Sequence, residues 1–216
     1  MSPATHPMSA DMPAATPTPT AVTVDAFLDR PRQDDRSYEL IHGEIVARAP
    51  TLVSPQIISG HLVRRISEAL DARPACSLRV EAAITLPSRD DSCYVADLAV
   101  ACGGYDPGAR TTPDPVLIVE ILSPSTEKHD RRVKLPDYRT IGSVQEIVLI
   151  DQDQLHCEVH RRLDEERWLV DLVRGRDAVL RLESCGLEQP LAALYTHIAL
   201  DEEPEQEPSS READGP

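Results

Sequence analysis

The sequence predicts an α/β fold in which a mixed β-sheet is flanked by helices and followed by a C-terminal β-meander. Residues 116–122 (VLIVEIL) form a nearly continuous apolar run, which is typical of a central strand buried on both faces. Shorter apolar segments on either side of this run predict further strands. Residues 125–140 predict a helix that crosses between two of them, so hairpins and one crossover connection together indicate a mixed sheet.

The first elements expected are a short helix, a hairpin and a longer helix. The short helix covers residues 23–30, and residues 38–49 predict a hairpin that turns at His42-Gly43, because glycine adopts the positive φ of a tight turn. Ser54-Pro55 combines an N-cap residue with proline at the first helical position, which predicts a helix that ends near residue 73. Its apolar face comprises Ile58, Leu62, Ile66 and Ala69.

The rest of the chain predicts strands around the crossover helix. These strands are expected at 78–86, 93–101, 115–122 and 145–151, with a terminal meander at 155–162, 167–173 and 178–182. Within the helix over 125–140, Pro136 removes a helical hydrogen bond and predicts a kink.

We expect one domain between two disordered tails. The chain has 216 residues, enough for one domain with a sizeable core at 21–200. Residues 1–20 are rich in Pro, Ala and Thr, and residues 201–216 are acidic. Neither segment has the apolar periodicity that offsets the entropy of ordering a chain.

The charge balance excludes broad, unspecific binding to nucleic acid, which needs a basic face. Seven acids against Arg211 give residues 201–216 a net charge of −6, and Asp11 gives residues 1–20 a charge of −1. Of the total of −15, residues 21–200 therefore keep −8. Any contact with DNA is expected to be local.

The sequence also predicts a cytoplasmic protein that makes no membrane contact. It lacks both an apolar stretch of the roughly 20 residues that span a bilayer and a signal peptide. Five scattered cysteines without a CxxC pair exclude disulfides and a zinc site and predict small buried side chains. They are Cys76, Cys93, Cys102, Cys157 and Cys185.

Two carboxylates interrupt predicted strands and form the candidate site. Glu120 lies within VLIVEIL, and Asp97 lies within YVADLAV on the preceding strand. If these strands pair across residues 102–114, alternation lets both acids point to one side. Two converging carboxylates suit Mg²⁺ or Mn²⁺, which prefer oxygen ligands. The alternative is a structural ion pair, since a buried carboxylate is costly unless a cation or hydrogen-bond donors accompany it.

A lysine on the following helix is the cation best placed to reach these acids. Asp130, Lys134 and Tyr138 are spaced at i, i+4 and i+8, so they share one helix face. We therefore expect the Lys134 ammonium to lie within hydrogen-bonding or one-water distance of Glu120 or Asp97. The alternative is a surface lysine that pairs with Asp130.

The ordered series VADLAV, VLIVEILSPST, the spaced helix residues and IGSVQEIVLID resembles the bacterial putative restriction endonuclease family of the PD-(D/E)XK nuclease superfamily. The resemblance extends from residue 38 to about residue 162. It implies a restriction-endonuclease-like fold and metal-dependent cleavage of DNA, with Asp97 as the metal-binding aspartate and Glu120 as the second acid. Two positions depart from the pattern: Ala96 replaces the usual proline, and Leu122 replaces the usual lysine. The resemblance implies that Lys134 supplies the missing cation.

The same resemblance suggests further candidates. In the hairpin, Glu44 is favoured over Glu39 as an additional ligand, although exposed hairpin charge explains either. His61 also matches a family position, although a packing role explains it as well, and Glu81 stands alone in its strand. For phosphate contact the basic residues are Arg64-Arg65 and a helical group, either of which is equally well explained as a solvated helix face. The helical group is Lys128, Arg131, Arg132, Lys134 and Arg139.

These observations lead to two functional hypotheses. The first is an Mg²⁺- or Mn²⁺-dependent endonuclease that hydrolyses DNA phosphodiester bonds. The alternative is a catalytically inactive nuclease-fold protein that binds nucleic acid or a protein partner, which the acidic charge and Leu122 favour. Whether the protein forms a homodimer is left open.

Overall fold

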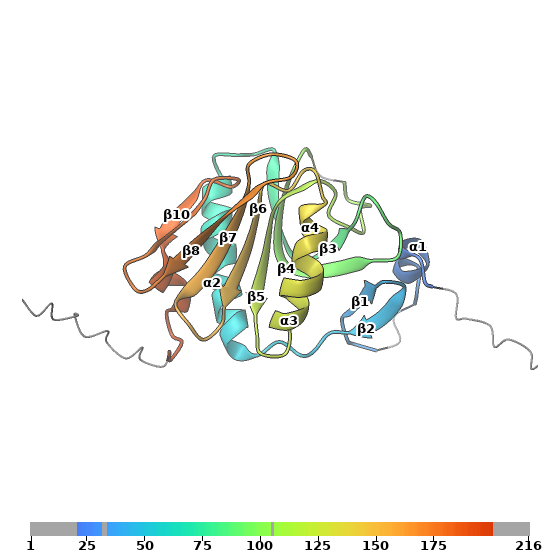
Figure 1. The fold of residues 1–216 in the computed structure, drawn as a ribbon, viewed down its shortest axis with the longest axis horizontal. Coiled ribbons are helices and arrows are strands. Elements are labelled where there is room, and N and C mark those ends of the chain that lie inside the picture. The colour runs from blue at the N-terminus through green and yellow to red at the C-terminus, as the bar shows by residue number, and fades with distance from the viewer. Residues whose placement is uncertain (1–20, 32–33, 105, 201–216) are drawn as a thin grey trace, which may run out of the picture.

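The computed structural model describes residues 21–31, 34–104 and 106–200 (Figure 1). The expected disordered tails, 1–20 and 201–216, lie outside the described residues. An eight-stranded sheet runs in the order β2-β1-β4-β5-β6-β7-β8, with β3 also paired to β4, and a separate two-stranded sheet joins β9 and β10. The mixed α/β architecture expected from the sequence is confirmed.

The strands and helices follow the predicted order. The strands are β1 (Tyr38–Ile41), β2 (Glu44–Ala47), β3 (Cys76–Thr85), β4 (Cys93–Cys102), β5 (Pro115–Leu122), β6 (Glu146–Asp151), β7 (His156–Arg162), β8 (Trp168–Arg174), β9 (Val179–Leu182) and β10 (Leu187–Pro190). The helices are α1 (Val24–Leu28), α2 (Val53–Leu70), α3 (Glu127–His129), the π-helical turn η1 (Asp130–Lys134), α4 (Leu135–Arg139) and the 3₁₀ helix η2 (Leu191–Tyr195).

One crossover makes the sheet mixed. Strands β5 and β6 are parallel, and the continuous helical segment α3–η1–α4 connects them. The strand pairs on either side of them are antiparallel. The carboxyl end of β5 therefore leads directly into the helix that carries Lys134.

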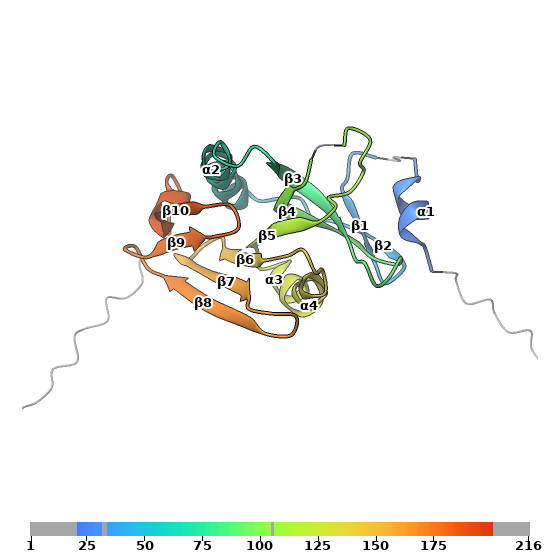
Figure 2. The same cartoon turned by 90° about the horizontal axis from the view of Figure 1, so that it is seen from above.

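Helices cover both faces of the sheet. Figure 2 shows α2 on one side and α3–α4 on the other. Alternate residues of β5 pack on opposite faces, with Val119 and Ile121 in the α2 core and Ile118 and Leu122 in the α4 core. By this alternation Glu120 points toward the α3–α4 face.

The structure corrects the expected start of α2. Ser54-Pro55 was expected to begin the helix, but the helix begins at Val53, with Leu52 as an N-cap that makes no side-chain cap bond. The predicted apolar face is confirmed for three residues, Ile58, Leu62 and Ile66, which are fully buried. Apolar burial therefore decides the position of α2 more strongly than its cap.

The cysteine expectation is half wrong. Cys93, Cys157 and Cys185 are free and buried, as predicted. Cys76 and Cys102, however, form a disulfide across the β3–β4 ladder. These two residues oppose each other in the strand register, which spacing along the chain does not show.

The C-terminal region departs from a simple meander. Strands β7 and β8 extend the large sheet, as expected. Strand β9 instead leaves it and pairs with β10, a strand that the sequence did not predict. In the part of the chain that the structure describes, no helix is long and apolar enough to cross a membrane.

Candidate functional site

The site lies where the edge of β4 changes partner. Strand β5 pairs with β4 from Ala101 to Leu98, and β1 pairs with it at Cys93. Strand β3 occupies the other edge along most of this length. The stretch around Val95 therefore faces a gap between β1 and β5, and side chains satisfy its backbone. The Val95 N–H donates to Glu39 Oε1 (2.8 Å), and its carbonyl accepts from Lys134 Nζ (3.5 Å).

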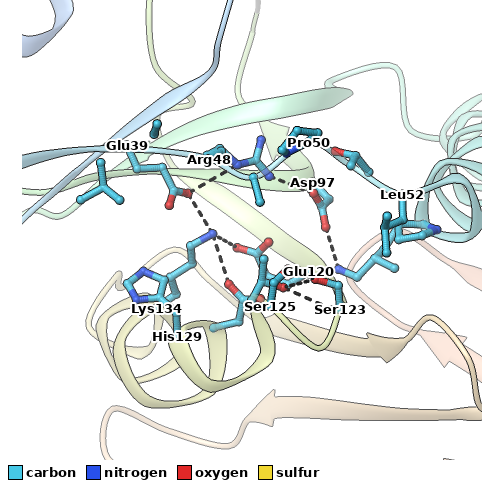
Figure 3. Close-up of a pocket in the computed structure, with 18 of the residues that line it drawn as sticks. Glu39, Arg48, Pro50, Leu52, Asp97, Glu120, Ser123, Ser125, His129 and Lys134 are labelled. Atoms are coloured by element: carbon cyan, nitrogen blue, oxygen red, sulfur yellow. Dashed lines mark hydrogen bonds and ion pairs between the residues drawn. The ribbon is translucent and has the colours of Figure 1, made fainter.

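Asp97 and Glu120 lie at the point where β4 and β5 separate. The last pair between these strands is Leu98 with Val119. Asp97 immediately precedes Leu98 in β4, and Glu120 immediately follows Val119 in β5. Asp97 Oδ2 accepts from the Ile121 N–H (2.7 Å), which fixes its carboxylate against β5. The two acids thus reach one pocket from neighbouring strands, as the sequence predicted (Figure 3).

The Lys134 ammonium reaches this pocket from the helix. Its Nζ atom lies 3.3 Å from Glu120 Oε1, which confirms the predicted contact. The same atom lies 2.9 Å from Glu39 Oε1 and 3.3 Å from Asp130 Oδ1. The Lys134 side chain is only 4% exposed, so the pair with Asp130 is buried rather than on the surface.

The helix geometry explains how Lys134 reaches back. Proline has no N–H to donate, and the turn before Pro136 widens into the π-helix η1, in which the Leu135 N–H donates to the Asp130 carbonyl. The sequence predicted a kink near Pro136, and the structure has this π-helical turn immediately before it. One turn further on, the buried Tyr138 hydroxyl donates to Glu120 Oε1 (2.6 Å).

A second cation, Arg48, enters from the hairpin. It follows β2 directly, and its Nη2 atom donates to Asp97 Oδ1 at 3.1 Å. Weaker ion pairs join Arg48 to Glu81 at 3.8 Å and to Glu39 at 4.0 Å. Burial opposes the charge of Arg48, but Asp97 and Glu39 outweigh it and raise the pKa of the guanidinium.

These groups line a pocket of about 290 Å³ that is rich in acids. With every group ionised, four carboxylates face two cations, an excess of two negative charges. The carboxylates belong to Glu39, Asp97, Glu120 and Asp130, and the cations to Arg48 and Lys134.

Burial has the largest effect on the protonation of the two central acids. Burial raises the pKa of Glu120 to about 8, because the nearby Lys134 only partly offsets it and Asp97 adds to it. Burial also raises the pKa of Asp97, against the Ile121 N–H and Arg48. Lys134 stays protonated, since Glu120 and Glu39 raise its pKa despite its burial. Burial therefore outweighs the two cations in setting the pKa values of Glu120 and Asp97.

We expect Glu120→Gln to be no less stable than wild type at pH 8 in the presence of a chelator. The folded protein keeps the Glu120 proton up to about pH 8, whereas the unfolded chain releases it near the ordinary glutamate pKa of 4.5. Between these two pH values the folded protein binds one more proton than the unfolded chain. The free energy of unfolding of the wild type therefore falls as the pH rises across this interval. The slope approaches about 1.4 kcal/mol per pH unit.

Urea unfolding at several pH values checks this expectation. At pH 5 the two proteins should be close, because both residues are then neutral, and the variant should gain on wild type as pH rises. Lys134 retains Glu39 and Asp130 as partners in the variant. A variant several kcal/mol weaker at pH 8 would instead identify Glu120 as half of a structural ion pair.

The donor set fits a divalent cation of the Mg²⁺ type. Across residues 21–31, 34–104 and 106–200, no three His, Cys, Asp or Glu side chains are arranged to enclose a metal ion. Mg²⁺ is commonly held by one or two carboxylates, with water and substrate phosphates at its other positions. Asp97 and Glu120, which line one pocket from neighbouring strands, are the carboxylates that could provide such a pair.

Three weaker candidates lie outside this arrangement or at its border. Glu44 is exposed beside the hairpin turn and does not line the pocket, whereas Glu39, the less favoured acid, does. His61 contacts the Thr196 carbonyl at 3.2 Å, away from the pocket. Glu81 is exposed. Among the ion pairs of the described residues, its link to the site is the pair with Arg48.

The basic residues considered for phosphate contact are dispersed. Arg131 pairs with Glu127 and Glu158, and Arg139 contacts His160. The pair Arg64 and Arg65 is bound to Glu68. Lys128 and Arg132 remain exposed on the helix that carries Lys134.

Two functional neighbours escaped sequence reasoning. Arg48 is not among the residues that the sequence singles out, because only the fold brings it to Asp97. Asp130 was predicted to share a helix face with Lys134 but not to belong to the site, whereas it is buried against Lys134. Its spacing from Lys134 was the available clue.

Known proteins resemble this chain over most of its length. Residues 24–193 match the model of the Uma2 family, described as "Putative restriction endonuclease". An uncharacterized protein of Synechocystis is 25% identical over 202 residues, covering 90% of this chain and 98% of the relative. A second uncharacterized protein of Synechocystis is 26% identical over 160 residues, covering 73% and 90%. The crystal structure of a "putative nuclease belonging to DUF820" from Anabaena variabilis has a TM-score of 0.66 at 21% identity. It covers 81% of this chain and 98% of its own, and this likeness shows the fold.

Proposed function

Because the chain belongs to the Uma2 family of putative restriction endonucleases, we propose that it is a metal-dependent endonuclease that hydrolyses DNA phosphodiester bonds. The observation that carries the proposal is the convergence of Asp97 and Glu120 from adjacent strands, with the Lys134 ammonium 3.3 Å from Glu120. Two acids can hold a metal ion, and a nearby cation can stabilise the charge that develops on a phosphate during hydrolysis.

Each residue has a distinct role in the proposed reaction. Asp97 and Glu120 would hold Mg²⁺ or Mn²⁺, which when bound polarises the phosphate and lowers the pKa of water. The Ile121 N–H and the Tyr138 hydroxyl orient the two carboxylates.

In this proposal Lys134 takes the role of the lysine that the family pattern has at the position of Leu122. Leu122 is buried in the α4 core, so the cation instead comes from the helix on the same side of the sheet. The three N–H groups of the ammonium are shared among four acceptors, so one can be exchanged for a substrate oxygen. There we propose that it stabilises the negative charge developing on the phosphate.

The proposed partner is DNA bound locally around this pocket. Lys128 and Arg132, exposed on the helical segment behind Lys134, are the basic residues available for phosphate contact. The acidic balance of the rest of the chain argues for a small footprint rather than an extended basic face.

Calorimetric titration with Mn²⁺ is the first test of the proposal. We expect wild type to bind Mn²⁺ and Asp97→Ala to lose this binding, because the variant lacks one of two carboxylate ligands. Asp91→Ala is the matched control, since Asp91 also pairs with an arginine but lies outside the pocket. Equal Mn²⁺ affinities in wild type and Asp97→Ala would contradict the metal site and favour the alternative, in which these carboxylates belong to a structural ion pair.

Cleavage of supercoiled plasmid in Mn²⁺ tests the hydrolysis itself. Binding of Mn²⁺ without cleavage would favour the alternative, a catalytically inactive nuclease-fold protein.

A further inference from the structure

Arg48 occupies the face of Asp97 that a metal ion would need. Its Nη2 atom donates to Asp97 Oδ1, and the other oxygen of the carboxylate accepts from the Ile121 N–H. Both oxygens are therefore engaged by hydrogen-bond donors. Figure 3 shows the guanidinium between the Glu39 and Asp97 carboxylates, with dashed lines to both.

A guanidinium and a divalent cation cannot share this carboxylate without cost. Both are positively charged, and at a partly buried position like charges within a few ångströms repel strongly. Asp97 is 22% exposed and Arg48 is 19% exposed, so water screens this repulsion only in part. A cation that binds Asp97 must therefore work against Arg48.

Alternative partners for Arg48 lie within reach. Glu39 and Glu81 are 4.0 and 3.8 Å from its guanidinium, on the β1 and β3 sides of the pocket. Glu81 lies opposite Asp97, because its neighbours pair as Val80 with Leu98 and as Ala82 with Ala96. Glu81 also has a positive φ of 49°, a strained backbone for a residue other than glycine. Its exposed carboxylate is a place to which the guanidinium can turn.

We propose that Arg48 is a built-in competitor for the divalent cation at Asp97. In the metal-free protein it neutralises Asp97, and it turns toward Glu81 and Glu39 when a metal ion binds. Arg48 thereby sets the cation concentration at which the site fills. This inference rests on the proposed metal site, but it concerns affinity rather than cleavage.

Titration with Mn²⁺ in the absence of DNA tests the competition directly. We expect Arg48→Met to bind Mn²⁺ roughly 5- to 150-fold more tightly than wild type, the usual range for coupling between two ligands. Arg89→Met is the matched control and should leave the affinity unchanged, because Arg89 pairs with Asp91 outside the pocket. The rise in melting temperature on adding Mn²⁺ should likewise be larger for Arg48→Met.

Each other outcome contradicts a definite part of the account. Equal or weaker binding by Arg48→Met would overturn the competition while leaving the proposed metal site intact. Binding by neither protein would overturn both. If Arg48→Met does not fold, Arg48→Gln takes its place, because its amide removes the positive charge and keeps a hydrogen-bond donor for Asp97. A smaller gain in affinity supports the competition, and none overturns it.

Discussion

Replacing Lys134 with methionine is expected to slow DNA cleavage by roughly 10²- to 10³-fold, the usual cost of removing one group that stabilises transition-state charge. Mn²⁺ affinity should be unchanged or higher, because the lost charge repels the metal ion rather than binding it. Initial cleavage rates and calorimetry measure the two effects separately. A loss of Mn²⁺ binding in step with cleavage would show that Lys134 supports the metal site instead.

Folding must be checked in the same variant. Lys134 forms buried ion pairs with the carboxyl groups of Glu39, Glu120 and Asp130, so its loss costs about 3–5 kcal/mol. Rates should therefore be compared at temperatures where denaturant melts show folded protein. Lys134→Arg is the matched variant that keeps the charge. It should rescue cleavage poorly, because the planar guanidinium fork does not reproduce a compact ammonium in this buried position.

Replacing Glu146 with alanine is expected to destabilise the fold by about 3–5 kcal/mol without changing the cleavage rate of the folded protein. Glu146 is also a buried acid on a central strand, but its carboxylate is fully bonded. It accepts from Arg161 Nε (3.0 Å), the Ser184 N–H (2.9 Å) and the Ser184 hydroxyl (2.5 Å). These contacts tie the two-stranded β9–β10 sheet to the large sheet.

Urea unfolding measures the Glu146 effect, and Glu188→Ala provides its control. Glu188 pairs with Arg181, but its side chain is 63% exposed, so its loss should cost no more than about 1 kcal/mol. If Glu146→Ala abolished cleavage while remaining stable, Glu146 would have to be counted with the site.

The contrast between Glu120 and Glu146 shows how far the sequence leads. Glu120 interrupts a continuous apolar run, and that interruption was enough to identify it. The helical spacing of Asp130, Lys134 and Tyr138 then placed a cation on the correct side of the sheet. Periodicity determines which face a side chain takes, so the central strands and these contacts could be predicted.

Contacts between elements distant in sequence could not be predicted in this way. Glu39 and Glu44 share one face of the hairpin, and only the register separates them: Glu44 sits beside the turn, while Glu39 reaches the gap along β4. Arg48 depends on where the hairpin docks. The disulfide depends on the pairing of Cys76 with Cys102 in the β3–β4 ladder.

The most direct measurement is the conversion of supercoiled plasmid by purified protein in Mn²⁺, with Glu120→Gln as the matched inactive variant. Wild type should produce nicked and linear DNA, a chelator should stop it, and Glu120→Gln should leave the plasmid supercoiled while remaining folded. Intact plasmid after incubation with wild type that binds Mn²⁺ would contradict the endonuclease. Equal cleavage by Glu120→Gln would place the active site elsewhere.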